Sequence, residues 1–139
     1  MTHTTGAQLT PKRAMEMVAE ARERIEIIGP EELAAELERG DAVVVDLRES
    51  DERVEHGAIP GAVHVPRGRL EFDADPTSPF HHDDLDPARR TVVHCAIGGR
   101  GALAADTLRQ MGYGNVANLG GGFDAWKQAG GRIEHPEDG

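Results

Sequence analysis

The chain has 139 residues, a length that suits one domain with a single hydrophobic core. Its formal net charge of −10 disfavours nucleic acid and anionic membrane surfaces as partners. The single cysteine excludes an internal disulfide. Together with the polar N-terminal residues and the absence of a long apolar run, this predicts a cytoplasmic protein.

Hydrophobic periodicity predicts helices that alternate with short strands along the chain. After a loose tail over residues 1–9, Thr10-Pro11 has the character of a helix start, and a helix is expected over 11–24. A strand at 25–28 and a helix over 30–40 follow. A short helix is expected near 50–54, and four later strands are expected at 42–47, 63–65, 91–94 and 116–119.

The arrangement of these elements predicts the fold class. The nearly continuous apolar run at 42–47 is typical of a parallel strand that is covered on both faces. Since strands and helices alternate, the fold is expected to be α/β and layered, with ligands at the carboxyl ends of the strands.

The single cysteine, Cys95, stands between the strand at 91–94 and a helix that is expected to begin near Arg100. A helix N-terminus carries unpaired N–H groups and partial positive charge. Gly98 and Gly99 let a short loop turn its amides inward, and Arg100 adds a full charge. Each feature favours a thiolate, so Cys95 is predicted to be a nucleophile in preference to a buried core cysteine.

Three further stretches stand in order around this loop: VVVDLR at 43–48, GAIPGA at 57–62 and GGFDAW at 121–126. Together with the Cys95 loop they resemble the rhodanese-like sulfurtransferase family. The resemblance divides the chain into an N-terminal tail and helix (1–24), a rhodanese-like domain (25–135) and a C-terminal tail (136–139). It implies a central, mainly parallel five-stranded sheet with helices on both faces.

The resemblance also implies the site. Cys95 carries the transferred sulfur as a persulfide, which the loop binds through Ala96, Ile97, Gly98, Gly99 and Arg100. Arg67, which follows Val65-Pro66 at the end of the strand at 63–65, is a further candidate for substrate binding. Asp46 and Arg48 are expected to support nearby loops, and Gly101 stands where the family usually has serine or threonine. No cofactor and no metal are expected.

The expected activity is transfer of a sulfane sulfur from thiosulfate, a persulfide or a polysulfide to a thiol or cyanide. The expected partners are therefore a small donor and acceptor, with a homodimer or a protein sulfur acceptor as further candidates. One alternative is a non-catalytic sulfur carrier or partner-binding module. A phosphatase or arsenate reductase is a weaker alternative, because such enzymes typically have one more residue between cysteine and arginine than the four found here.

Other motifs are interpreted as structural. The four adjacent residues HHDD at 81–84 cannot easily converge on one metal ion, and they belong to a polar, proline-rich loop over 72–88 that has room to overhang the site. Gly112-x-Gly114 follows a helix and precedes a strand, which is the reverse of a dinucleotide fingerprint. His94 is expected to point away from Cys95, because neighbouring strand residues face opposite sides.

Overall fold

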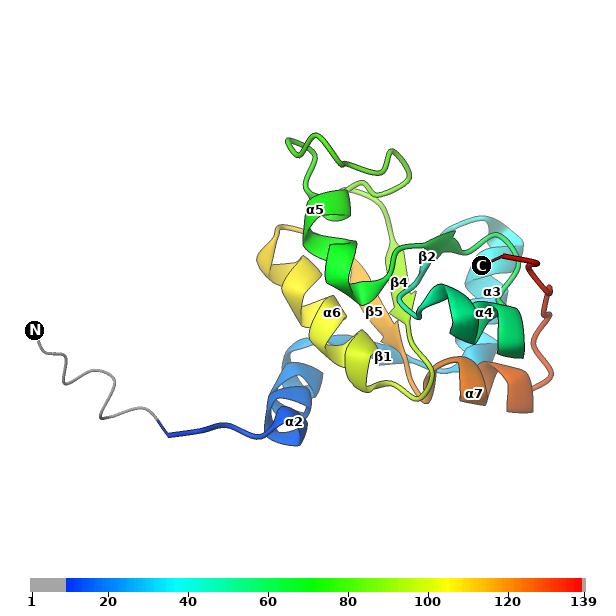
Figure 1. The fold of residues 1–139 in the computed structure, drawn as a ribbon, viewed down its shortest axis with the longest axis horizontal. Helices are drawn as coiled ribbons and strands as arrows, with labels where there is room; N and C mark the ends of the chain where they lie inside the picture. The colour runs from blue at the N-terminus through cyan, green and yellow to red at the C-terminus, as the bar shows by residue number, and fades with distance from the viewer. Residues whose placement is uncertain (1–9, 139) are drawn as a thin grey trace, which may run out of the picture.

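The computed structural model describes residues 10–138, so the predicted tail at 1–9 lies outside the described residues. Five parallel strands form one sheet in the order β1-β5-β4-β2-β3. They are β1 (Glu26–Ile28), β2 (Val43–Asp46), β3 (Val63–His64), β4 (Thr91–His94) and β5 (Val116–Leu119). The predicted α/β class and five-stranded parallel sheet are confirmed (Figure 1).

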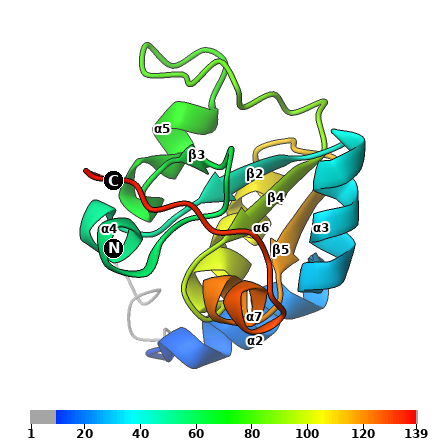
Figure 2. The same cartoon turned by 90° about the vertical axis from the view of Figure 1, so that its right-hand side faces the viewer.

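Helices cover both faces of this sheet (Figure 2). They are α2 (Ala14–Arg24), α3 (Pro30–Arg39), α4 (Ser50–His56), α5 (Leu70–Ala74), α6 (Gly99–Gln110) and α7 (Gly122–Gln128), with a short 3₁₀ turn η1 (Arg67–Arg69). Within 10–138, no helix is both long and apolar enough to cross a bilayer.

Successive side chains along a strand point into two different apolar cores, one on each face of the sheet. In β2, Val43 and Val45 pack with residues of α5 and α6, whereas Val44 packs with residues of α3 and α7. In β4, Val93 packs in the core with α5 and α6, and Val92 packs in the core with α3 and α7. Because side chains alternate along a strand, His94 lies on the α3/α7 face, and Cys95 lies on the α6 face at the carboxyl end of the central strand. The predicted separation of the two side chains is confirmed.

Helix α2 begins at Ala14, three residues later than the sequence suggests. It packs on α6 through a small cluster of Val18, Ala21 and Ala102, and Arg24 Nη1 donates to Asp106 Oδ2 at 2.9 Å. The helix therefore covers the first turns of α6, as Figure 1 shows.

The segment over 72–88 lies at the far end of α6 from Cys95, so the expectation that it overhangs the site is wrong. Tyr113, which follows the C-terminal end of α6, donates its hydroxyl to Ala74 O at 2.8 Å. Leu85 is buried in the core on the α6 face. These two contacts fix the loop beside the end of α6, at the top of the molecule in Figures 1 and 2.

Candidate active site

Cys95 is buried, with 1% of its surface exposed, directly after β4. Its Sγ accepts two backbone N–H groups, from Gly98 at 3.0 Å and from Gly101 at 3.3 Å. Both donors belong to the N-terminal end of α6, whose dipole adds partial positive charge. This arrangement stabilises negative charge on sulfur without a side-chain donor.

The conformation of Gly98 makes this geometry possible. Its φ of 119° lies in the left-handed region, which side chains with a Cβ disfavour. Gly98 O accepts Ala102 N–H at 2.9 Å, which begins the helical hydrogen bonds of α6. The chain therefore turns from strand to helix within four residues, 95–98, while the amides of Gly98 and Gly101 face Sγ.

The N-terminus of α7 fixes the other side of the loop. Phe123 N–H donates to Cys95 O at 2.8 Å, and Asp124 N–H donates to Ala96 O at 3.0 Å. Gly122 is required where the two segments meet, because a Cβ there would lie 2.6 Å from Cys95 O and its φ is 60°. The loop carbonyls thus bind α7 while the loop amides bind Sγ. The sequence has three consecutive glycines at 120–122, which favour a tight turn, but it does not show these contacts.

Asn118 of β5 explains why Gly101 stands where the family usually has a hydroxyl residue. A Cβ on Gly101 would collide with Asn118 Oδ1. Asn118 Nδ2 donates to Gly98 O at 3.3 Å, and Asn118 Oδ1 is buried without a hydrogen-bond partner among the described residues. The amide of Asn118 occupies the space of the absent side chain. Sequence reasoning missed Asn118, which carries no motif.

Arg100 does not stand free beside Cys95. Its Nη1 and Nη2 both donate to the Glu52 carboxylate at 2.8 Å. These hydrogen bonds outweigh partial burial and lower the pKa of Glu52 to about 2. The sequence suggests that Arg100 is the main local cation, but in the structure its charge is balanced by α4. Since 48 positions separate the two residues, sequence spacing gives no signal of this pair.

Asp46 and Arg48 form a buried bidentate pair at the end of β2. Arg48 Nε and Nη2 donate to the two Asp46 oxygens at 3.0 and 2.9 Å, and Arg53 Nε donates to Oδ2 at 3.0 Å. Burial would raise the pKa of Asp46, but the hydrogen bonds from Arg48 and the nearby positive charges lower it overall. Arg48 also donates to Gly57 O at 2.8 Å, which connects β2 to the turn after α4.

His94 is buried beside this pair and stacks on Phe123 with ring centroids 6.1 Å apart. Its Nδ1 lies 3.1 Å from Cys95 O, and since a carbonyl only accepts, Nδ1 carries the ring proton. Burial lowers the pKa of His94, against the attraction of Asp46. The neutral ring thus supports the Cys95 carbonyl from the face opposite the thiol.

Arg67 is not brought to the loop. Its guanidinium donates to Glu71 Oε1 at 3.0 Å and to Thr107 Oγ1 at 3.3 Å. Thr107 lies two turns along α6 from Gly99, about 12 Å at the helical rise. A substrate that reaches Cys95 is therefore bound by other residues in this conformation.

The loop is accessible to solvent at its tip and beside one cavity. Ile97 is 69% exposed at its tip. A small cavity of about 120 Å³ lies between α4 and α7, and its lining residues are Arg48, Glu52, His56, Ala96, Phe123, Asp124 and Lys127. No group of three His, Cys, Asp or Glu side chains within residues 10–138 is placed to hold a metal ion.

Comparison with known proteins identifies the class. A family model described as a rhodanese-like domain matches residues 29–129. The match spans most of the chain, and the chain therefore belongs to the rhodanese-like family, as its motifs suggest.

Two similar proteins carry sulfurtransferase names, and a third carries a different description. A sulfurtransferase of Allochromatium vinosum is 34% identical over 97 residues, which cover 70% of this chain and 82% of the relative. The structure of a thiosulfate sulfurtransferase from Pseudomonas aeruginosa is 31% identical with a TM-score of 0.71, over 88% of this chain but only 22% of the longer protein. A Rhodopseudomonas palustris protein of unknown function, described as a possible tyrosine phosphatase, is 40% identical with a TM-score of 0.85, over 91% and 98% of the two chains.

Proposed function

We propose that the protein is a sulfurtransferase that accepts a sulfane sulfur on Cys95 and passes it to cyanide or a thiol. The observation that carries the proposal is the pair of backbone N–H groups that meet Cys95 Sγ at the start of α6. Names of relatives in two organisms support the same chemistry.

The first half-reaction is written for thiosulfate as donor. The Cys95 thiolate attacks the outer sulfur, a new Sγ–S bond forms, and the S–S bond of thiosulfate breaks with its electron pair leaving on sulfite. The product is a Cys95 persulfide anion. The inward loop amides, which already donate to Sγ, are placed to stabilise the added negative sulfur.

In the second half-reaction an acceptor attacks the outer sulfur of the persulfide. With cyanide, a C–S bond forms, the S–S bond breaks and thiocyanate leaves, which restores the thiolate. No proton and no external electrons are needed, so the chain requires neither cofactor nor metal. A thiol acceptor consumes the same persulfide.

The two alternatives are a phosphatase and a sulfur carrier, and the site argues against the first more than the second. A phosphatase loop wraps a tetrahedral oxyanion and typically has five residues between its cysteine and its arginine, whereas only four separate Cys95 from Arg100. A sulfur carrier uses the same Cys95 persulfide but transfers it to a protein thiol. A sulfurtransferase and a sulfur carrier therefore share the same site, and only a measurement of turnover distinguishes them.

The test is the intact mass after exposure to thiosulfate and to glutathione persulfide. We expect the wild type to gain one sulfur atom, lose it to cyanide with release of thiocyanate, and turn over repeatedly. Cys95→Ser keeps the loop volume and is expected to show no adduct and only background turnover, with an unchanged melting temperature as control. Absence of an adduct on the wild type with either donor contradicts the proposal, and an adduct that cyanide cannot remove but a protein thiol can favours the carrier.

A further inference from the structure

The proposed first step requires a dianionic donor to approach a protein of net charge −10. The cations near the loop on the α4 side are already engaged: Arg100 is bound by Glu52, and Arg48 is bound by Asp46. Lys127 lines the small cavity together with the carboxylates of Glu52 and Asp124. An anion that approaches from this side therefore meets carboxylates as well as cations, and positive charge on the other side of the loop would favour its binding.

Helix α2 lies against the opposite side of the loop. A Cβ on Gly99 would lie 4.0 Å from Val18 Cγ2, and Ala21 packs on Ala102 of α6. One turn after Val18, Arg22 Nη2 lies 3.7 Å from the position that a Cβ on Gly98 would occupy. Because the N–H of Gly98 donates to Cys95 Sγ, the guanidinium of Arg22 stands at the rim of the sulfur-binding loop.

The Arg22 guanidinium is also available. Arg22 is exposed and forms no ion pair or hydrogen bond within residues 10–138. Its acidic neighbour on the same helix, Glu20, accepts Lys12 Nζ at 2.9 Å, and the next arginine, Arg24, is bound to Asp106. Arg48 and Arg100 each bind a carboxylate, whereas Arg22 binds none within residues 10–138 and lies on the side of the loop away from Glu52 and Asp124.

We propose that Arg22 is a substrate-binding residue that contacts the anionic end of the sulfur donor, the sulfonate of thiosulfate in the simplest case. This inference rests on the proposed function. It assigns a role to α2, which precedes the residues that the family model matches. The glycine at position 98 leaves the space between guanidinium and loop open, since a larger side chain there would fill it.

The chemistry fits an arginine at this place. As the S–S bond of thiosulfate breaks, negative charge moves onto the departing sulfite, and a guanidinium offers paired N–H donors to oxyanions. The glycine-rich loop meets the transferred sulfur while Arg22 meets the oxygens. The two halves of the donor are thus bound by different elements, α6 and α2.

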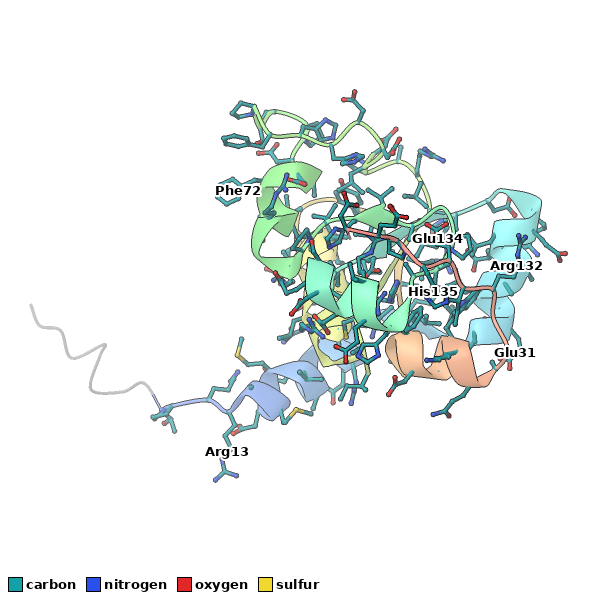
Figure 3. All side chains as sticks on the ribbon, turned by 45° about the vertical axis from the view of Figure 1, so that its right-hand side comes forward. Arg13, Glu31, Phe72, Arg132, Glu134 and His135 are labelled. Atoms are coloured by element: carbon teal, nitrogen blue, oxygen red, sulfur yellow. The ribbon has the colours of Figure 1, made fainter. Side chains whose placement is uncertain are left out.

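Arg22→Gln tests the proposal, with Arg13→Gln as the matched control. Arg13 precedes the same helix and points away from the body of the protein (Figure 3), so its loss changes the net charge equally. In single-turnover loading of Cys95, we expect Arg22→Gln to raise the half-saturating thiosulfate concentration about fivefold with little change in the maximal rate. The effect is expected to fade in high salt, because an exposed cation is screened.

A second measurement does not depend on sulfur transfer. Iodoacetate carries a negative charge and iodoacetamide does not, so the ratio of their alkylation rates at Cys95 reports the local cation. We expect this ratio to fall about threefold in Arg22→Gln and to stay unchanged in Arg13→Gln. Equal behaviour of the two variants, in loading or in alkylation, overturns the role of Arg22. If the wild type takes up no sulfur while the alkylation ratio still depends on Arg22, the proposed function fails and the anion-binding role stands.

Discussion

The ends of β2 and β4 lie side by side in the sheet, with Asp46 opposite His94, yet they are built differently. At the end of β2, buried charges meet one another: Asp46 binds Arg48 and Arg53. At the end of β4, the hydrogen bonds that Cys95 Sγ accepts within residues 10–138 come from backbone N–H groups. Paired side-chain charges stabilise the end of β2, whereas peptide dipoles face the proposed reactive atom at the end of β4.

This difference has an energetic consequence. A buried ion pair that loses one partner leaves an uncompensated charge, which is strongly destabilising. The donors to Sγ belong to the backbone, so a substitution other than proline leaves each N–H in place unless the loop moves. Substitutions at the two strand ends are therefore expected to separate stability from reactivity.

The largest effect is expected for Asp46→Asn. It leaves Arg48 and Arg53 buried without their carboxylate, and the free energy of unfolding should fall by about 3–5 kcal/mol. Urea denaturation measures the change. Asp83→Asn, at an exposed position, is the control and should alter stability by less than about 0.5 kcal/mol. A loss at Asp46 no larger than at Asp83 would show that the β2 end does not depend on paired charge.

A medium effect is expected for Gly101→Ala, because the added Cβ collides with Asn118 Oδ1. Overpacking of this kind costs about 1–3 kcal/mol, although alanine is the better helix former. In an Asn118→Ala background the same substitution should cost less, with a coupling energy of about 0.5–3 kcal/mol.

Gly99→Ala is the control for this cycle, since its Cβ would make only an ordinary contact with Val18. It should be tolerated without loss of stability in both backgrounds. Additive free energies for Gly101→Ala and Asn118→Ala would contradict the steric account of Gly101.

The smallest effect concerns the partly exposed pair of Glu52 and Arg100. The folded pKa of Glu52, about 2, lies below its ordinary value of 4.5, so the pair stabilises the fold above pH 4.5 and loses this contribution as the pH falls toward 2. We expect wild type and Glu52→Gln to differ by about 1 kcal/mol or less near neutral pH and to converge in acid. Glu55→Gln, on the same helix with a 75% exposed side chain, should show no such convergence. A difference that grows in acid would contradict the sign.

Local patterns predicted the sheet well. The apolar run around Val44, the strand at Thr91–His94 and the strand at Val116–Leu119 appear where periodicity places them, because burial between two helical layers dictates their composition. The position of Cys95 between strand and helix follows from the same patterns. Thr10-Pro11 predicts too early a start for α2, because the helix is capped at Arg13, whose N–H donates to Glu16 Oε1 at 3.2 Å.

What the sequence did not show depends on contacts between distant residues. The partner of Arg100, the space filled by Asn118 and the approach of Arg22 to Gly98 each join segments that no spacing relates. The family motifs point to Cys95 as the candidate nucleophile, but they do not tell which neighbouring charges are free. Only the three-dimensional structure separates paired from unpaired arginines, because the sequence does not show whether a carboxylate from a distant segment binds them.

The exposed tip of the loop has a consequence for how such a protein can diverge. The backbone of the loop is fixed from both sides, through the Cys95 and Ala96 carbonyls bound by α7 and the amides turned toward Sγ. Ile97, 69% exposed between these fixed points, contributes little to the core. Evolution or a protein engineer can therefore exchange this side chain without disturbing the fold, and if the proposed function holds, selectivity among donors can change at position 97 while the backbone around Cys95 stays the same.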